Sequence, residues 1–138
     1  TGFESQGHGF IRTDFPGGWQ DDTVNCFIKT GRTEDQNEAF DFLQKLLSWR
    51  QIQPAIHEGK MIHFVPEDGI YVFFRVNEDA AVMVILNNND SEEMVPTARF
   101  AECMMGYTSA VDPITKVRIS DIRIIPVPAK STTILELH

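Results

Sequence analysis

The chain has 138 residues, enough for one domain with a buried core or for one domain with an appendage. Hydrophobic residues make up 42% and charged residues 23%, an ordinary globular composition that excludes wholesale disorder. The formal net charge of −8 argues against nucleic acid and anionic membranes as partners, because both attract basic surfaces. The charge does not exclude neutral ligands such as sugars, or other proteins, as partners.

Residues 1–32 contain most of the glycines and show no sustained helical or strand periodicity. Within them the sequence FPGGW at 15–19 predicts a turn, because proline fixes φ and glycine tolerates positive φ. A long segment without regular structure is uncommon inside a compact domain. We therefore expect residues 1–32 to be functional or to belong to a larger fold.

Residues 33–52 predict one long amphipathic helix. Thr33, followed by Gln36, forms a capping box, and Pro54 ends the helix because the residue before a proline avoids the α region. Helical spacing gathers an apolar stripe with two aromatic residues beside it: Ala39, Phe40, Leu43, Leu46 and Leu47, flanked by Phe42 and Trp49. This arc is wider than the usual stripe of about 100°, so the helix needs partners on two sides.

The remaining residues predict β-structure. Strands at 61–65, 70–76 and 80–86 form an antiparallel meander, and the third is apolar on both faces, as a central strand is. Weaker strands follow at 92–95, 107–111, 117–119, 122–125 and 132–137, with a helical turn within 97–104. The expected fold class is mainly β: an antiparallel β-sandwich of about eight strands, preceded by a glycine-rich loop and one long α-helix.

Side chains that could take part in catalysis or metal binding are few and scattered. Cys26 and Cys103 lie far apart and are expected to be free thiols packed as small apolar side chains. No two histidines have the i, i+4 spacing of a helical metal site, so neither a metal nor another cofactor is predicted. Adjacent acids occur in two turns, where solvated charges are the simpler interpretation: Asp21 and Asp22, and Glu67 and Asp68. The sequence therefore predicts no catalytic residue.

One group of residues in the glycine-rich segment suits a sugar ligand. Arg12 and Asp14 flank a turn that is followed by Trp19. A guanidinium and a carboxylate can bind sugar hydroxyls, while an indole can cover the C–H face of the ring. The alternative is an Arg–Asp surface pair that only ties the loop down.

The loop and helix together resemble a group within the α-amylase superfamily, that of neopullulanase, cyclomaltodextrinase and maltogenic amylase. The similarity runs through GFIRTDFPGGW at 9–19, GRT at 31–33 and FLQKLLSWR at 42–50. It continues through PAIHEGK at 54–60 and FVPEDGIYVFFR at 64–75. Together these segments cover essentially the whole chain.

The resemblance implies a domain division. Enzymes of this group are (β/α)₈ barrels followed by an antiparallel β-sandwich. Residues 1–54 would be a remnant of the catalytic barrel, comprising its last loop and last helix, and residues 55–138 the C-terminal sandwich domain. Barrel enzymes build their active sites from such loops, which would account for the glycine-rich segment.

The resemblance also implies an activity for the parent protein. The group hydrolyses α-glucosidic bonds with retention, using an Asp nucleophile, a Glu acid/base and a further Asp. No part of this chain matches the segments that carry them, so the chain alone should be inactive. Its partners would be the upstream barrel and an α-glucan oligosaccharide, in the periplasm or alternatively the cytoplasm. The oligomeric state stays open, with a homodimer as one candidate.

Site residues follow from the same resemblance. Members of the superfamily often hold a sugar with an Asp and an Arg in the last barrel loop, and Arg12 occupies the expected position of that Arg. The companion Asp would come about four residues earlier, where this chain has His8 and Gly9. The implied substrate-binding residues are Arg12, Asp14, His8 and Trp19.

Two alternatives remain. A free-standing carbohydrate-binding module would need exposed aromatic residues on one sheet face, and Tyr71 and Phe73 are the adjacent strand candidates. A purely structural interaction domain would lack the sugar contact altogether. If the chain is part of a barrel enzyme, the helix at 33–52 has one face for the sandwich and one for the barrel. We then expect this chain to leave one face uncovered, or to hide it against residues 1–32 or a second copy.

Overall fold

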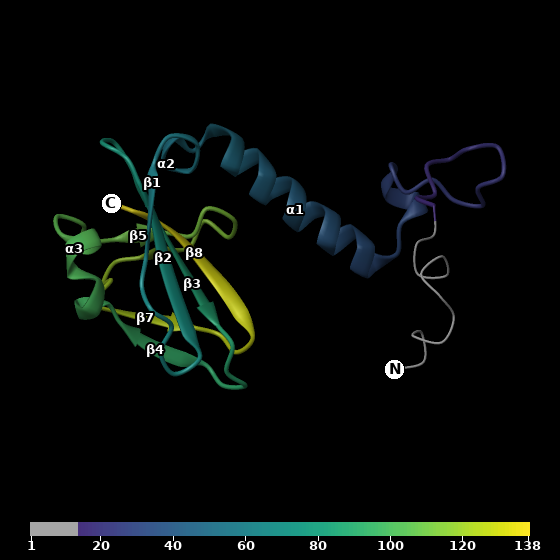
Figure 1. Cartoon of the computed structure of the whole chain (residues 1–138). Helices are drawn as coiled ribbons and strands as arrows, with labels where there is room; N and C mark the ends of the chain where they lie inside the picture. Colours follow the sequence, from purple (N-terminus) through teal and green to yellow (C-terminus); the bar gives the residue numbers. More distant parts are fainter. Residues whose placement is uncertain (1–13) are drawn as a thin grey trace. The chain divides into compact units, whose positions relative to one another are not determined.

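The computed structural model describes residues 14–138 (Figure 1), which form two compact units: a first unit that ends at Leu43 and a second unit, Gln44–His138. The long helix α1 (Glu34–Ile52) contributes residues to both units. In the described part of the chain, no helix is both long enough and apolar enough to cross a membrane. Each unit is described by itself below.

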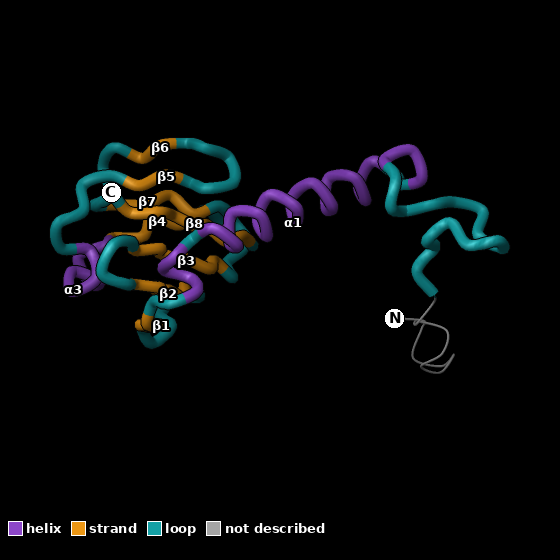
Figure 2. Tube along the Cα trace, turned by 90° about the horizontal axis from the view of Figure 1, so that it is seen from above, coloured by secondary structure: helices purple, strands orange, loops and turns teal. Residues whose placement is uncertain are grey.

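The second unit contains eight strands in two antiparallel sheets, as predicted. The larger sheet has the order β1-β2-β3-β8-β5-β6, and the smaller pairs β4 with β7; Figure 2 shows β6 beside β5. The strands are β1 (Lys60–His63), β2 (Ile70–Val76), β3 (Ala81–Asn87), β4 (Glu93–Pro96), β5 (Ala110–Val111), β6 (Arg118–Ile119), β7 (Ile124–Val127) and β8 (Ser131–Leu137). We call these two sheets the sandwich.

The meander of β1, β2 and β3 is antiparallel, as predicted. Ile62 lies opposite Phe74, which in turn lies opposite Met83. β3 pairs with β8 on its other side, so its position in the middle of the sheet matches its apolar sequence. The expected helical turn within 97–104 is present as a 3₁₀ helix, η2 (Thr97–Phe100), followed by α3 (Ala101–Met104).

The core lies between the two sheets. Phe74 of β2 is fully buried there with Met83, Ile125 and Leu135, which come from β3, β7 and β8. Its ring centroid lies 5.9 Å from that of Phe64 and 6.1 Å from that of Phe100. Alternation along β2 places Val72 and Phe74 inward. It leaves Tyr71, Phe73 and Arg75 half-buried on the opposite face, which we call the outer face of the larger sheet.

One end of the sandwich is organised by Asn87, the last residue of β3, which is only 3% exposed. Its Nδ2 atom donates hydrogen bonds to the carbonyl oxygens of Ser91, Val127 and Pro128 at 2.9, 3.0 and 3.0 Å. Its Oδ1 atom accepts a hydrogen bond from the backbone N–H of Asn89 at 2.9 Å. One side chain therefore links the β3–β4 turn to the β7–β8 turn.

Helix α1 begins with the predicted capping box. The Thr33 N–H donates to Gln36 Oε1 at 3.0 Å, and the Gln36 N–H donates to Thr33 Oγ1 at 3.3 Å. The helix ends at Ile52, but a short helix not predicted from the sequence, α2 (Pro54–His57), follows directly. Gln53 caps it by accepting a hydrogen bond from the Ala55 N–H. Pro54 ends one helix and starts the next, because a proline in the first turn loses no helical hydrogen bond.

In the first unit, residues 14–32 fold back on themselves. A β-bridge joins Gly17 to Asn25, and a 3₁₀ helix, η1 (Lys29–Gly31), precedes α1. Gly18 has a φ of +83°, as the predicted turn requires. The hydrogen-bonded turn lies slightly later than expected, where the Asp22 N–H donates to the Trp19 carbonyl.

Candidate functional site

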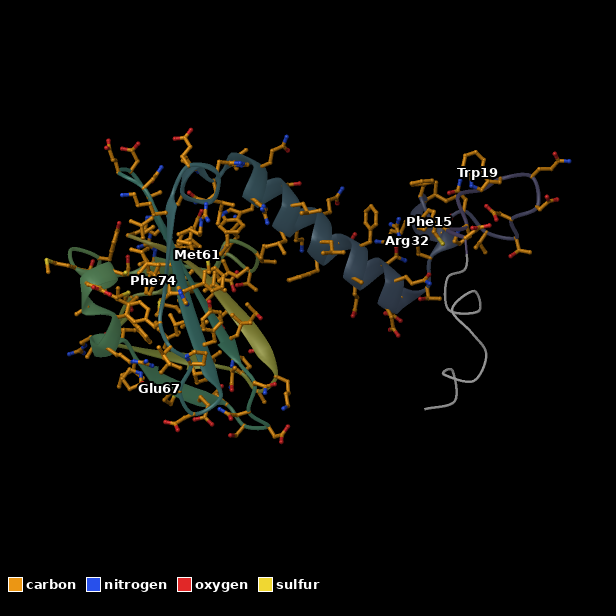
Figure 3. All side chains as sticks on the ribbon, in the orientation of Figure 1. Phe15, Trp19, Arg32, Met61, Glu67 and Phe74 are labelled. Atoms are coloured by element: carbon orange, nitrogen blue, oxygen red, sulfur yellow. The ribbon has the colours of Figure 1, made fainter. Side chains whose placement is uncertain are left out.

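The four predicted sugar-binding residues are only partly described. His8 and Arg12 lie outside the described residues. Asp14 is exposed, and Trp19 has 74% of its surface exposed in the first unit (Figure 3). Their role in sugar binding therefore stays a prediction.

The acidic side chain of Asp22 positions the backbone around Trp19. Its Oδ2 atom accepts hydrogen bonds from the N–H groups of Gly18 and Trp19, both at 2.9 Å. Asp22 is half-buried, whereas its neighbour Asp21 is exposed. Asp22 is therefore a structural residue that presents Trp19, a role that its place in an acidic pair did not indicate.

Arg32 connects the loop of the first unit to the start of α1. Its Nη1 atom donates to the Cys26 carbonyl at 2.9 Å, and its Nε atom donates to Asn37 Oδ1 at 2.8 Å. The guanidinium carbon lies 3.9 Å from the centroid of the Phe40 ring, a cation–π contact. Arg32 thereby fixes one wall of an apolar cavity of about 370 Å³, which we call the loop pocket. It is lined by Phe15, Pro16, Cys26, Phe27, Arg32, Gln36, Ala39 and Phe40.

The apolar stripe of α1 is largely uncovered, as expected for one of its two faces. No residue of α1 is buried. Phe40, Leu43 and Leu47 have exposed fractions of 41%, 52% and 58%. Burying such side chains stabilises a fold by roughly 1.5–3 kcal/mol each, so this stripe is a surface that would gain stability from a partner.

The other side of α1 is fixed to the outer face of the larger sheet. Glu136 Oε1 accepts hydrogen bonds from Trp49 Nε1 at 2.7 Å and from Gln53 Nε2 at 2.6 Å. We call these three residues the Glu136 clamp. Beside it, Arg75 Nη2 donates to the Ile56 carbonyl at 2.7 Å. The clamp thus holds Trp49, near the C-terminal end of α1, against the sheet.

The clamp leads to a prediction about stability. The Glu136→Ala substitution should lower the free energy of unfolding of the second unit by about 2 kcal/mol, because two donors lose their partner. The measurement is urea denaturation followed by Trp49 fluorescence in a Trp19→Phe background, which leaves Trp49 as the only tryptophan. Glu136→Gln keeps one acceptor oxygen and should cost less than half as much. Equal losses for the two variants would contradict this role of Glu136.

The outer face does not offer the aromatic platform that a free-standing carbohydrate-binding module would need. The rings of Tyr71 and Phe73 lie 5.8 Å apart, but both side chains are half-buried. Phe73 packs with Trp49 and Ile56 against a small buried cluster around Val84. This packing matches the expectation that Phe73 contributes to a core.

The other polar candidates also have structural partners. Glu67 pairs with Arg99 at 2.8 Å, and Asp68 occupies a tight turn with a φ of +48°. Cys26 and Cys103 are free thiols, as predicted. Burial raises the pKa of the Cys103 thiol, and the Glu102 carboxylate raises it further. Within residues 14–138, no three His, Cys, Asp or Glu side chains are grouped so that they could hold a metal ion.

Comparisons with solved structures show where this fold recurs. The chain superposes on the α-amylase of Geobacillus thermoleovorans in complex with acarbose (TM-score 0.62, 16% identity), covering 78% of this chain and 24% of that one. It matches AmyP in complex with maltose (TM-score 0.65, 19% identity) over 75% of this chain and 21% of that one. A cyclic α-maltosyl-(1→6)-maltose hydrolase from Arthrobacter globiformis matches with a TM-score of 0.55 and 15% identity. That match covers 78% of this chain and 22% of the hydrolase.

The chain thus spans less than a quarter of the length of each of these proteins. At these low identities, the superpositions establish a common fold and nothing further. A match to a family model shows the family to which the chain belongs. The model of the cyclo-malto-dextrinase C-terminal domain matches residues 61–136, more than half of the chain, from β1 into β8. The chain therefore belongs to the cyclo-malto-dextrinase C-terminal domain family.

Proposed function

We propose that this chain is the C-terminal part of an α-glucan-degrading glycoside hydrolase. Its sandwich stabilises a catalytic (β/α)₈ barrel that precedes it, and its N-terminal loop contributes to the substrate cleft. The observation that carries the proposal is the uncovered apolar stripe of α1, on a helix that the Glu136 clamp fixes to a sandwich of this family. Such a helix is the expected last element of a barrel whose other elements would cover the stripe.

The energetics support a stabilising role. Phe40, Leu43 and Leu47 each leave two-fifths or more of their surface in contact with water. At about 25 cal/mol per Å² of apolar surface buried, covering the stripe would contribute several kcal/mol to the stability of a barrel. The clamp would couple the barrel to the sandwich, because a movement of α1 out of the barrel would break the hydrogen bonds between α1 and Glu136.

The loop supports a role in the cleft. Trp19 presents an exposed indole on a backbone that Asp22 holds in place, and a fixed aromatic ring suits the C–H face of a glucose unit. Asp14, His8 and Arg12 would add polar contacts to the sugar hydroxyls. We therefore retain all four residues as proposed substrate contacts on the non-reducing side of the scissile bond.

The test compares three proteins: the complete gene product, the same product ending at residue 53, and this chain. Hydrolysis of maltooligosaccharides, cyclodextrin and pullulan is measured for each. We expect the complete product to be active and this chain to be inactive. The shortened product should have a lower melting temperature and a lower rate of hydrolysis than the complete product. A gene without an upstream barrel carrying an Asp, a Glu and a second Asp would overturn the proposal.

Calorimetry separates this function from that of a free-standing carbohydrate-binding module. Titrating maltooligosaccharides into the 138-residue chain should release no measurable heat, because a loop that forms one side of a cleft is incomplete without the rest. A dissociation constant in the micromolar range, which corresponds to a binding free energy of about −8 kcal/mol, would favour the carbohydrate-binding module.

A further inference from the structure

The smaller sheet of the sandwich has an open edge at β4. Within residues 14–138 this sheet consists of β4 and β7, so β4 has no strand on its other side. The Thr97 N–H donates to the Arg123 carbonyl at 3.0 Å, and two residues earlier Val95 lies opposite Ile125. Because hydrogen-bonded pairs alternate along an antiparallel ladder, the N–H and C=O of Met94 point away from β7 and towards the open edge.

Two prolines agree with this register. Met94 lies opposite Pro126, and Pro96 lies opposite Ile124. Neither proline has an N–H group to donate to the paired strand, so both fit at positions whose backbone groups point away from it. The backbone of Met94 therefore offers one donor and one acceptor at the edge of the sheet.

A cleft of about 320 Å³ runs along this edge, between β4 and the tight turn at residues 67–70. We call it the edge cleft, and Glu67 on its far wall is labelled in Figure 3. The turn is held in place, because Glu67 and Ile70 exchange backbone hydrogen bonds at 2.8 and 3.1 Å and Asn89 Nδ2 donates to the Asp68 carbonyl at 2.8 Å. Met94, 58% exposed, adds an apolar side chain to the near wall.

The charges around the edge cleft favour a cationic partner. One guanidinium lines it, that of Arg99, with three carboxylates, those of Glu67, Asp68 and Glu93. The guanidinium is already engaged, because Arg99 Nη2 donates to Glu67 Oε1 and to the Val65 carbonyl, both at 2.8 Å. The excess of negative charge attracts cations and repels anionic ligands.

We propose that the edge cleft binds a short, extended, positively charged segment of a partner protein, which adds as a strand to the open edge of β4. Main-chain hydrogen bonds to Met94 attach the segment, and its lysine or arginine side chains meet the carboxylates of the cleft. The contact is short because the 3₁₀ helix η2 begins at Thr97 and ends the strand.

The position of the edge cleft separates it from the surface proposed to meet the barrel. β4 belongs to the smaller sheet, whereas the Glu136 clamp lies on the outer face of the larger sheet, across the core. The inference therefore goes beyond the proposed function and does not depend on it. A second copy of the chain is disfavoured as the occupant, because each copy has a net charge of −8.

Peptide binding tests the proposal. A fluorescein-labelled hexapeptide of alternating lysine and valine is titrated with this chain and with the complete gene product, and its anisotropy is measured. We expect saturable binding to both proteins, with dissociation constants that agree within about twofold, and no binding of the matching glutamate–valine peptide. If the lysine peptide fails to bind this chain, the inference is wrong. Binding to this chain but not to the complete product would also overturn it, because the product's own fold would then fill the cleft.

A backbone variant distinguishes strand addition from general attraction. Met94→Pro removes the N–H at the open edge and leaves the pairing with β7 intact, as Pro96 and Pro126 do. It should weaken binding of the lysine peptide by about tenfold, whereas Met94→Val, which keeps the N–H, should change it less than about twofold. The melting temperature of each variant checks that the fold is retained. Equal binding by Met94→Pro and wild type would contradict strand addition.

Charge variants test the same cleft without changing the backbone. The double substitution Asp68→Asn and Glu93→Gln removes two charges from the edge cleft and should weaken binding by about tenfold. The matched control, Glu78→Gln with Asp79→Asn, removes two charges from exposed residues at the other end of β2 and should have less than about a twofold effect. Equal weakening by the two pairs would overturn the inference, because the charge of the whole chain would then attract the peptide.

Discussion

Replacing Phe74 with alanine should lower the free energy of unfolding of the sandwich by about 4 kcal/mol, a large part of the roughly 5–15 kcal/mol that stabilises an ordinary domain. The Phe74 side chain is fully buried and contacts the rings of Phe64 and Phe100. Its loss removes transfer free energy and leaves a cavity between the two sheets. β2 pairs with β1 on one side and with β3 on the other, which limits how far its backbone can shift to fill the cavity.

Phe42→Ala is the matched control, because the same atoms are removed from a side chain that is 50% exposed on α1. We expect it to change the free energy of unfolding by less than about 1 kcal/mol. Urea denaturation followed by far-ultraviolet circular dichroism measures both variants. Similar losses in the two would show that the core is not centred on Phe74.

The Asn87→Asp substitution should cost about 3 kcal/mol at neutral pH, although it changes no heavy-atom position. The wild-type Nδ2 atom donates to three carbonyl oxygens. The introduced carboxylate can donate to none of them, and its negative charge would lie among their partial negative charges in a buried site. The adjacent exposed residue offers a control, and Asn88→Asp should be close to neutral.

The pH dependence of the Asn87→Asp variant provides a second readout. Burial beside three carbonyl groups should raise the pKa of the introduced carboxyl in the folded state above its value in the unfolded chain. The folded state then binds more protons, so the destabilisation relative to wild type should shrink as the pH falls and grow as it rises. A difference between variant and wild type that is constant from pH 4 to pH 8 would show that charge is not the cause.

Elements with strong local signals were predictable from the sequence. The capping box at Thr33, the alternation along β2 and the apolar run of β3 each depend on residues within one element. The fold class followed from the number and spacing of such elements. The width of the apolar arc of α1 indicated a need for partners on two sides. The expectation of an uncovered face came from the resemblance to barrel enzymes.

Features that depend on distant residues were not predictable. Glu136 contacts Trp49 and Gln53 across more than eighty residues of sequence, and nothing near Glu136 marks it as an acceptor. β5 and β6 lie within the strands predicted at 107–111 and 117–119, but the pairing of β5 with β8 depends on residues far away in the sequence and was not predicted. Strand 107–111 was predicted too long, because Gly106 has a φ of +92° and the N–H groups of Thr108 and Ser109 donate to the His138 carbonyl.

In the loop, the residue types indicated a sugar site, but the contacts that arrange these residues could be seen only in the folded structure. The turn residues at 15–19 indicated where Trp19 would be displayed. They did not indicate that Asp22 would hold its backbone or that Arg32 would build the loop pocket. Besides these contacts, the loop contains a β-bridge between Gly17 and Asn25, which was also not predicted.

The place of β8 in the larger sheet has a consequence for biosynthesis. β8 is the last strand of the sequence, yet it lies between β3 and β5, where it joins the meander to the short strands of the far edge. During translation, the sheet therefore cannot close until residues 131–137 have left the ribosome. Until then, the β3 edge stays unpaired and the apolar side chains of the core stay accessible to chaperones.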